Sequence, residues 1–213
     1  MYTGIIQTLG RVYEANMKAN LLNFKVEVDA AKLDNIFVGA SCAIDGVCFT
    51  VVSIENNCLE FDSIKQTLDN TTIGDLKIGD LVHFERSAKY GDENGGHNIS
   101  GHVHTKVELV RLLNEKNNHT LVFKTDSDWI KYIFDKGYIS LQGASLTVSF
   151  VNVSECEFGV SLIPETLRQT NFGKLNIGDY QNIEVEQQTK TIVDVVERTL
   201  DRKKWLVQKV DSR

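Results

Sequence analysis

The chain of 213 residues repeats itself, and this repeat constrains the fold more than any other feature of the sequence. Residues 45–51 (Asp-Gly-Val-Cys-Phe-Thr-Val) match residues 142–148 (Gln-Gly-Ala-Ser-Leu-Thr-Val) at a separation of 97 residues, and Thr3-Gly4 matches Ser100-Gly101 at the same separation. A repeat near 100 residues is too long for a solenoid and fits two similar domains. We therefore expect a second domain that begins near Asn98.

The separation grows slightly farther along the chain. Residues 66–74 match residues 165–173, and residues 77–80 match residues 176–179, at a separation of 99 residues. The difference predicts two inserted residues in the second half, in the loop near residues 152–155. We expect an N-terminal barrel over residues 1–97, a C-terminal barrel over residues 98–190 and a terminal helix over residues 191–213.

Most of the chain has the pattern of short strands. β-branched and aromatic residues concentrate in four runs, at residues 23–28, 48–54, 81–84 and 120–124. Glycine, asparagine and aspartate separate such runs, which predicts an all-β barrel or sandwich rather than a parallel sheet. Within the two halves, only residues 127–136, between the capping residue Ser127 and Gly137, and a shorter run at residues 31–35 have helical patterns.

The last segment breaks the repeat. Residues 191–210 have apolar side chains at close to helical spacing, namely Ile192, Val195, Val196, Leu200 and Leu206. Acidic residues come early and basic residues late, the order that a helix dipole favours. The helix could pack on its own domain or on a neighbouring subunit, and the pattern leaves both open.

The composition excludes several classes of partner. A net charge of -6 argues against a general binder of nucleic acid or of membrane surfaces, because both need a basic face. No apolar run reaches the length of a membrane span. The start of the chain does not have the pattern of a secretory signal, and the four cysteines show no CxxC spacing. These features predict a cytoplasmic protein with reduced cysteines.

The stretch Gly-Gly-His-Asn-Ile-Ser-Gly-His-Val-His at residues 95–104 holds three of the five histidines. Separations of five and two residues between His97, His102 and His104 match no common zinc pattern, and alternation would place His102 and His104 on one face. The histidines could simply be polar residues at a domain junction. We favour a neutral histidine that moves protons or binds a ring, because its pKa lies near the working pH.

Cys48 and Ser145 occupy equivalent places in the repeat, each two residues after a glycine. Either could be a plain core or surface residue, and the second glycine of a hydrolase nucleophile elbow is missing after Ser145. Hydroxyls at Thr67 and Thr166 are also equivalent, as are the apolar Ile64 and Ile163. Apolar walls with a few polar groups suit a flat heterocycle, so the repeat predicts a site for two copies of one heteroaromatic ligand.

At these residues the sequence resembles the bacterial riboflavin synthases of the trimeric α type. The resemblance covers nearly the whole chain, and its ordered motifs are highly specific. They are residues 1–6 (Met-Tyr-Thr-Gly-Ile-Ile), 45–51, 95–97 with 100–102, 136–137, 143–148 and 162–167 (Leu-Ile-Pro-Glu-Thr-Leu).

The resemblance implies two six-stranded Greek-key barrels in tandem and a C-terminal helix that joins a homotrimer. It implies a transferase of riboflavin biosynthesis that uses no cofactor and no metal. Two molecules of 6,7-dimethyl-8-ribityllumazine would dismutate by four-carbon transfer to riboflavin and 5-amino-6-ribitylaminouracil. The site would lie between the first barrel of one subunit and the second barrel of the next, and lumazine synthase is a candidate partner.

The resemblance also implies roles for individual residues. His102 would shuttle protons, Ser145 with Glu186 as its acidic partner would stabilise or deliver the adding oxygen, and Cys48 would line the first-barrel ligand. The remaining residues expected to contact the ligands are Tyr2, Thr3, Gly4, Ile5, Ser41, Thr50, Asp62, Ile64, Thr67, Gly101, Val103, Lys136, Gln142, Thr147, Leu162, Ile163 and Thr166.

The chain departs from the family pattern at four places. Tyr2 replaces a phenylalanine, Gln142 replaces an aspartate, Glu186 replaces an aspartate, and residues 66–69 (Gln-Thr-Leu-Asp) replace Glu-Thr-Leu-Arg. Because glutamine cannot act as a carboxylate, we expect Gln142 to lower turnover. These departures keep a rival open, a non-catalytic antenna protein that binds a lumazine or flavin, but the retained motifs favour the enzyme. A structural protein without a ligand would leave the duplicated polar positions unexplained.

Overall fold

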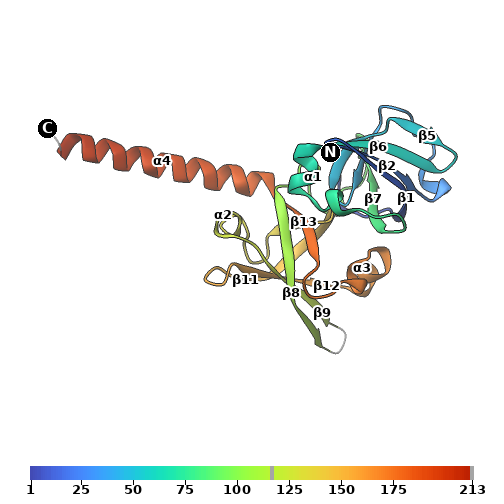
Figure 1. Ribbon diagram of the computed structural model, residues 1–213. Helices are drawn as coiled ribbons and strands as arrows, with labels where there is room; N and C mark the ends of the chain where they lie inside the picture. The colour runs from blue at the N-terminus through green and yellow to red at the C-terminus, as the bar shows by residue number, and fades with distance from the viewer. Residues whose placement is uncertain (116–117, 212–213) are drawn as a thin grey trace.

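The computed structural model describes residues 1–115 and 118–211, and it contains two β-barrels and one long helix that extends away from them (Figure 1). The expected all-β class with a terminal helix is confirmed. Each barrel has its own apolar core, with Phe24, Phe49 and Phe61 in the first and Phe123 and Phe158 in the second.

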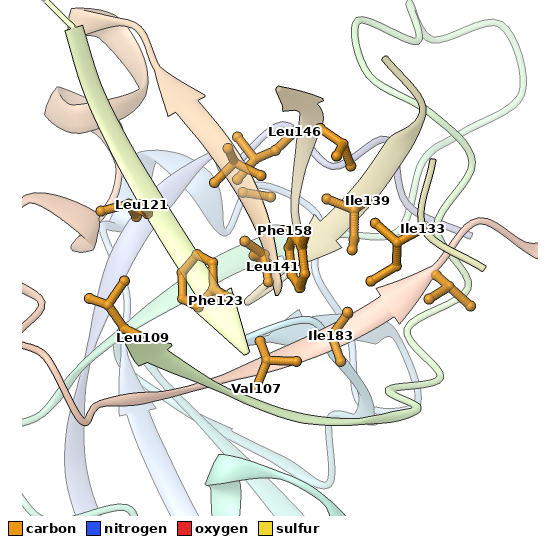
Figure 2. Close-up of a cluster of buried hydrophobic side chains, with 14 of the residues drawn as sticks. Val107, Leu109, Leu121, Phe123, Ile133, Ile139, Leu141, Leu146, Phe158 and Ile183 are labelled. Carbon is orange, nitrogen blue, oxygen red and sulfur yellow. The ribbon is translucent and has the colours of Figure 1, made fainter. Parts of the chain in front are cut away.

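The second barrel is a closed ring of six strands. The strands are β8 (Thr105–Glu115), β9 (Asn118–Lys124), β10 (Tyr138–Leu141), β11 (Ala144–Asn152), β12 (Glu157–Leu162) and β13 (Tyr180–Val185), in the spatial order β10-β11-β12-β9-β8-β13 with antiparallel neighbours. Alternate side chains of these strands point inward and fill the ring, as Figure 2 shows for Leu109, Leu141 and Ile183.

The first barrel has the same plan with one strand interrupted. Its strands are β1 (Thr8–Lys18), β2 (Leu21–Glu27), β3 (Ser41–Ile44), β4 (Val47–Thr50), β5 (Ser53–Glu55), β6 (Cys58–Ile64) and β7 (Leu81–Arg86), in the order β4-β3-β7-β1-β2-β6-β5. The predicted strand at residues 48–54 is therefore broken between β4 and β5. Val51 N–H bonds to Ala40 and Val52 N–H to Glu60, so the chain changes partner there. In β11 the register shifts between Val148 and Phe150, close to the matching position, and β4 with β5 thus counts as one bulged strand.

Two tight turns bring the barrels together. Asp45-Gly46 and Gln142-Gly143 form two-residue hairpin loops in which all four residues have positive φ, between 46° and 81°, as type I′ turns require. A Cβ on Gly46 would lie 2.5 Å from the backbone nitrogen of Gly143. The repeated glycines thus meet at an approximate twofold axis, where no side chain fits.

The predicted insertion is confirmed. The turn between β5 and β6 contains Asn56 and Asn57, whereas the matching turn between β11 and β12 contains residues 153–156. The change in repeat separation from 97 to 99 residues arises from this longer turn.

Two segments cross from one barrel to the other. We call residues 2–6 the N-terminal strap and residues 99–103 the central strap; they meet in a two-way bridge between Tyr2 and Ile99. Ile6 is part of the core of the second barrel, and Val103 packs against the core of the first. The strap at the start of each repeat therefore serves the barrel of the other repeat.

The two predicted helices that lie between strands of the barrels are shorter than predicted. In place of a helix over residues 127–136, α2 spans only Ser127–Ile130, and Asp126 rather than Ser127 accepts the capping hydrogen bonds. Turns follow α2, and Lys136 has a left-handed φ of 61°. The run at residues 31–35 forms a 3-10 turn at Ala30–Lys32. The short helices α1 (Lys65–Asn70) and α3 (Pro164–Gln169) follow β6 and β12 in equivalent places.

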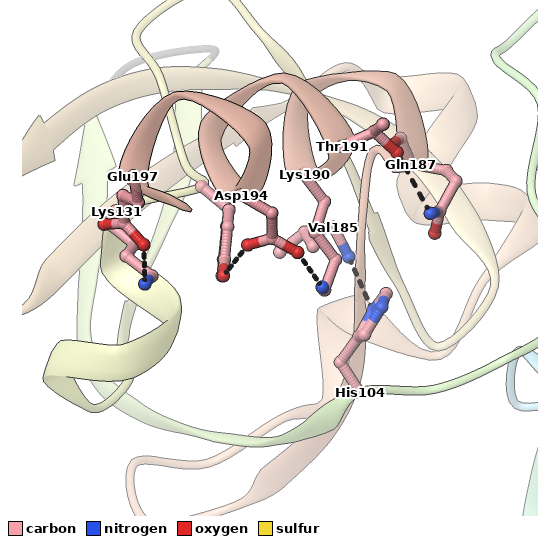
Figure 3. Close-up of polar contacts among 9 residues, drawn as sticks. His104, Lys131, Val185, Gln187, Lys190, Thr191, Asp194 and Glu197 are labelled. Atoms are coloured by element: carbon pink, nitrogen blue, oxygen red, sulfur yellow. Dashed lines mark hydrogen bonds and ion pairs between the residues drawn. The ribbon is translucent and has the colours of Figure 1, made fainter. Parts of the chain in front are cut away.

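The terminal helix α4 spans Gln187–Asp211 and so begins four residues before the predicted start at Thr191. Polar contacts hold its first turns to the second barrel: Asp194 accepts from Tyr132, and Glu197 pairs with Lys131. Asp194 also pairs with Lys190 of the same helix (Figure 3). The side chain of Leu206, one of the predicted apolar positions, lies outside the described side chains. Within residues 1–115 and 118–211, no helix is long and apolar enough to cross a membrane.

Candidate ligand pockets

A pocket of 240 Å³ opens on the first barrel, and it gathers five of the predicted site residues. It lies between β4, α1 and the central strap. Its predicted residues are Cys48, Thr67, Gly101, His102 and Val103; the others are Val47, Gln66, Asn70 and Thr71. The sequence therefore predicted most of this pocket, from segments that lie far apart along the chain.

Other predicted residues lie on the outer face of the same strands. Alternation on β4 turns Thr50 outward together with Cys48, and alternation on β6 does the same for Asp62 and Ile64. Ser41 pairs with Thr50 across β3 and β4. Asp62 accepts a hydrogen bond from the Asn23 amide at 2.9 Å. An apolar and polar outer face thus adjoins the pocket.

Cys48 is held at the pocket wall by two contacts. Its backbone N–H donates to the Gly101 carbonyl at 2.9 Å, and the Tyr2 hydroxyl donates to its Sγ at 3.1 Å. Tyr2 is only 2% exposed, and burial raises the pKa of its hydroxyl, so the hydroxyl stays protonated. Tyr2, predicted to contact ligand, therefore contacts the thiol of a pocket residue.

Ser145 has the matching place on the second barrel. Its backbone N–H donates to the Gly4 carbonyl at 2.9 Å, the counterpart of the Cys48 contact. Its Oγ lies 2.6 Å from Nδ1 of His97, and the imidazole of His97 stacks on Tyr138 with 5.1 Å between ring centroids. Ser145 and His97 thus form a hydroxyl–imidazole pair beside the N-terminal strap.

The electrostatic surroundings keep His97 neutral. Burial lowers the pKa of His97, and the nearby carboxylate of Glu186 opposes this shift only in part. A neutral imidazole can accept the Ser145 hydroxyl proton at Nδ1. The pair therefore has the arrangement of a hydroxyl with an adjacent base.

The predicted grouping of His102, Ser145 and Glu186 is not assembled within one chain. His102 lines the first-barrel pocket, whereas Ser145 contacts His97 on the second barrel. Glu186 directly precedes α4 and accepts from the Thr189 hydroxyl, although it lies close enough to influence His97. The prediction overlooked His97, because three histidines lie close together in the sequence and no local pattern shows which one meets Ser145.

Five further predicted residues lie on the second barrel, on or next to its strands β10, β11 and β12. Thr147 points outward on β11, Ile163 is exposed, and Thr166 lies on α3. Lys136 N–H bonds to the Val148 carbonyl next to Thr147. The fifth, Leu162, has its side chain in the second core, so only its backbone could reach a ligand.

Gln142 lies away from this site, in the interface between the barrels. It is 5% exposed, and its Oε1 accepts the Asn182 N–H at 2.9 Å, as Asp45 accepts the His83 N–H at 2.8 Å in the other repeat. The expectation that Gln142 contacts a ligand finds no support in these contacts. An amide replaces the expected carboxylate here because either group supplies the oxygen that the turn needs.

The same interface contains a buried polar pair in equivalent positions. His83 bonds to the Gln142 carbonyl at 2.9 Å and accepts the Asn171 N–H at 3.1 Å. Asn182 makes the matching contacts, to the Asp45 carbonyl at 2.9 Å and from the Thr72 N–H at 2.7 Å. Burial lowers the pKa of His83 to about 4, so its imidazole is neutral at pH 7.

A cavity of 610 Å³ forms an open groove between the barrels. Of the predicted site residues it includes only Gln142, and its rim is built from the turns around Asp80 and Asp179. The smaller first-barrel pocket is therefore the better candidate for the ligand, because the predicted polar groups converge there.

The three clustered histidines point to three different places. His97 contacts Ser145, His102 lines the first pocket, and His104 accepts the Val185 N–H at 3.2 Å and packs on Trp129. The prediction that His102 and His104 share a face is wrong, because residues 100–104 precede β8 and do not alternate as a strand. Among the described residues, no three His, Cys, Asp or Glu side chains are placed to bind a metal ion.

Comparison with known proteins supports the duplicated architecture. The sequence matches the family described as "Lumazine binding domain" twice, over residues 3–87 and 100–186. It shares 45% identity over 201 residues with the riboflavin synthase of Escherichia coli (strain K12), which covers 94% of this chain and 93% of the relative. The riboflavin synthase of Buchnera aphidicola subsp. Schizaphis graminum is 42% identical over 203 residues, covering 95% of this chain and 97% of the relative.

Solved structures have the same fold at lower sequence identity. LumP complexed with riboflavin has a TM-score of 0.80 and 22% identity, covering 88% of this chain and 100% of that chain. LumP complexed with 6,7-dimethyl-8-(1'-D-ribityl) lumazine has a TM-score of 0.77 and 21% identity, covering 86% of this chain and 98% of that chain.

Proposed function

The chain belongs to the riboflavin synthase family of lumazine-binding proteins. We propose how its two barrels carry out the reaction of this family. The protein is a transferase that converts two molecules of 6,7-dimethyl-8-ribityllumazine to riboflavin and 5-amino-6-ribitylaminouracil. LumP is a structural neighbour with lumazine and with riboflavin bound, which supports this fold as a holder of both substrate and product.

One observation carries the assignment of chemistry, the contact between Ser145 Oγ and His97 Nδ1 at 2.6 Å. One lumazine needs a nucleophile to add to its ring, and the other needs a proton removed from a methyl group. Ser145 presents an oxygen at the second-barrel site, and neutral His97 takes its proton as that oxygen adds. The same histidine returns the proton when the oxygen leaves, which is general base and then general acid catalysis.

The first-barrel pocket holds the second lumazine. Cys48, Thr67 and the strap residues Gly101 and Val103 form its walls, and His102 at its mouth moves protons. Equivalent frameworks suit two identical ligands because each offers the same outer face and the same helix. The two barrels differ in one polar pair, Cys48 with Tyr2 in the first and Ser145 with His97 in the second. This difference gives the two ligands different chemical surroundings. Fixing both reactants in this way can supply up to roughly 7–11 kcal/mol in ideal systems.

A complete site needs two copies of the chain. Within one chain His102 and Ser145 belong to different barrels, which supports a site formed by the first-barrel pocket of one subunit and the second barrel of the next. The exposed apolar residues of α4, Ile192, Val195, Val196 and Leu200, support assembly of a homotrimer through this helix. We retain residues 1–97, 98–190 and 191–213 as the functional division of the chain.

We also propose a location in the cell and a partner protein. The four cysteines are free thiols, the state that a reducing cytoplasm maintains, which supports a cytoplasmic protein. Lumazine synthase is the candidate partner.

The antenna alternative has one observation in its favour, the likeness to LumP. That likeness, at 21–22% identity, shows the fold alone, whereas the relatives named riboflavin synthase reach 42–45% over most of the chain. The enzyme is therefore the function that the chain supports best.

Steady-state turnover of Ser145→Ala and His97→Gln tests the assigned chemistry. We expect each variant to lower kcat by about 10²–10⁴-fold, the usual range for general acid–base catalysis, while lumazine binding measured by fluorescence stays within a few fold. Thr147→Val, which removes a neighbouring outward hydroxyl, is the matched control and should act mainly on KM. Wild-type protein that binds lumazine and forms no riboflavin would reject the enzyme and favour the antenna.

A further inference from the structure

Two buried carboxylates grip the straps that cross between the barrels. Glu85 on β7 accepts from the backbone and the hydroxyl of Thr3, at 2.7 and 2.8 Å, and from Gly4 N–H at 3.1 Å. Glu184 on β13 accepts from the backbone and the hydroxyl of Ser100, both at 2.7 Å, and from Gly101 N–H at 2.9 Å. The two carboxylates are equivalent in the repeat, and both are at most 5% exposed.

Each strap then supports a site residue of the other barrel. The Gly4 carbonyl receives the N–H of Ser145, and the Gly101 carbonyl receives the N–H of Cys48. The glycines also pack directly on these residues: a Cβ on Gly4 would lie 2.5 Å from Ser145 Cβ, and one on Gly101 would lie 2.6 Å from Cys48 Cβ. Because both glycines have φ near 80°, the strap backbone has little freedom to move without moving its partner.

We infer that Glu85 and Glu184 are crossed positioning residues, in which Glu85 of the first barrel sets the geometry of Ser145 in the second, and Glu184 of the second barrel sets the geometry of Cys48 in the first. The chain of contacts runs from carboxylate to strap to site residue, and each step is a hydrogen bond of 3.1 Å or less. Neither carboxylate touches the pocket residue that it positions.

A carboxylate is suited to hold the strap because of the hydrogen bonds that it accepts. An ionised carboxylate accepts several hydrogen bonds at once, and bonds to a charged acceptor are stronger than neutral ones. A glutamine has one acceptor oxygen, and its amide would place N–H groups against the N–H groups of the strap. Loss of the charge therefore loosens the strap, and the residue at the far end of the strap gains freedom.

The alkylation rate of a single thiol can report the geometry of each site separately, and this measurement does not require catalysis. Cys48 reports the first-barrel pocket directly, and Ser145→Cys introduces a thiol that reports the second. Purified full-length protein is treated with iodoacetamide, and the modified peptides are quantified by mass spectrometry. Cys42, which is fully buried, reports any general unfolding in the same sample.

We expect Glu184→Gln to change the alkylation rate of Cys48 by at least about 5-fold, corresponding to the loss of roughly one hydrogen bond, and Glu85→Gln to leave it within 2-fold (~0.4 kcal/mol). In the Ser145→Cys background the order reverses, and Glu85→Gln has the large effect. The two glutamates are thus each other's controls. Thr3→Val and Ser100→Ala, which remove only one bond to each carboxylate, should show the same crossed pattern with smaller changes and stay folded if the glutamine variants do not.

An effect of each glutamate on the thiol of its own barrel would overturn the inference, because simple packing within a barrel predicts that result. Equal effects on both thiols, or no effect on either, would also overturn it. The inference takes Cys48 and Ser145 as pocket residues from the proposed function, but the alkylation pattern does not depend on catalysis. A crossed pattern in a protein that makes no riboflavin would uphold the inference and reject the function.

Discussion

Tyr2 and His97 make corresponding contacts to Cys48 and Ser145, although the two residues do not match in the repeat. Tyr2 donates to the thiol of Cys48, and His97 meets the hydroxyl of Ser145. The repeat-equivalent of Tyr2 is Ile99, which is buried and apolar. At the scale of single residues, the two halves therefore differ where a polar partner contacts a pocket side chain.

Tyr2→Phe tests the contact in the first pocket. Phenylalanine keeps the ring and removes only the hydroxyl, so we expect the free energy of unfolding to fall by about 0.5–1.5 kcal/mol, the net contribution of a typical hydrogen bond. Urea denaturation measures this change. Tyr13→Phe, at an exposed tyrosine, should change stability by less than about 0.5 kcal/mol. Equal values for the two variants would show that the Tyr2 hydroxyl contributes nothing.

The sequence predicted Cys48 and Ser145 because the turn before them is repeated, and glycine is required there for a positive φ and a close approach. It did not predict the partner of Ser145. His97 reaches Ser145 through a tertiary contact across 48 residues, and nothing local distinguishes it from His102. Gln142 was expected to contact a ligand because it is a polar residue next to a repeated glycine, but such a residue can instead serve the hairpin itself.

At the scale of elements, α4 has two different faces. Asp194 and Glu197 contact the barrel, and Val193 packs on its core. Ile192, Val195, Val196 and Leu200 are all more than half exposed. At 3.6 residues per turn these four side chains form one stripe, turned away from the barrel contacts. Such a stripe is typical of a helix that packs on other subunits.

Ile192→Glu combined with Val196→Glu tests this stripe. Both side chains are exposed in the single chain, so the barrels should stay folded, while two buried carboxylates would oppose association. We expect sedimentation to show a monomer in place of a trimer, and a chain that ends at Lys190 to behave in the same way. Ile78→Glu, at an equally exposed isoleucine on the first barrel, is the control. An unchanged mass for the double variant would place the subunit contact elsewhere.

Element boundaries were less predictable than element types. The strand pattern at residues 48–54 is continuous in the sequence, but the backbone partners change at Val51 and Val52. The helical pattern at residues 127–136 ends at Ile130, and the chain then turns to pair with β11, where Lys136 N–H bonds to the Val148 carbonyl and Val148 N–H to the Gly137 carbonyl. Both differences arise from pairing with distant strands, which no local pattern contains.

At the scale of the whole molecule, polar side chains join the barrels, and the two repeats have different residues at the equivalent positions, His83 and Asn182. His83 and Asn182 each bond to one carbonyl and one backbone N–H of the other barrel, and the groups that they contact are equivalent in the repeat. Phe172 packs edge-on against the His83 ring at 5.0 Å, and Asp45 accepts the His83 N–H. The sequence predicted two domains, but it did not predict how they meet, because the hydrogen bonds of His83 and Asn182 across the interface join residues 59 to 137 positions apart.

His83→Asn, which copies the other half of the interface, should change how stability depends on pH. The pKa of His83 is lowered by burial from 6.5 to about 4, so the unfolded chain binds a proton before the folded protein does. Stability from this group is complete above pH 6.5 and is lost as the pH falls towards 4, by up to about 3 kcal/mol.

The variant should therefore lose less stability than the wild type between pH 6.5 and 4 in urea titrations. Burial raises the pKa of Asp45 to about 7, which acts in the opposite direction: that contribution is present below about pH 4 and is lost as the pH rises towards 7. Because Asp45 is present in both proteins, its effect largely cancels in the difference. Parallel stability curves for the two proteins would contradict a buried neutral His83.

The product balance of the reaction tests the central claim most directly, that a duplicated fold joins two copies of one ligand. Purified full-length protein is incubated with 6,7-dimethyl-8-ribityllumazine in EDTA and without nucleotide, and the products are quantified by chromatography. We expect riboflavin and 5-amino-6-ribitylaminouracil in equal amounts, one of each for every two lumazines consumed. Lumazine that stays bound and unchanged, or riboflavin formed without the uracil, would contradict it.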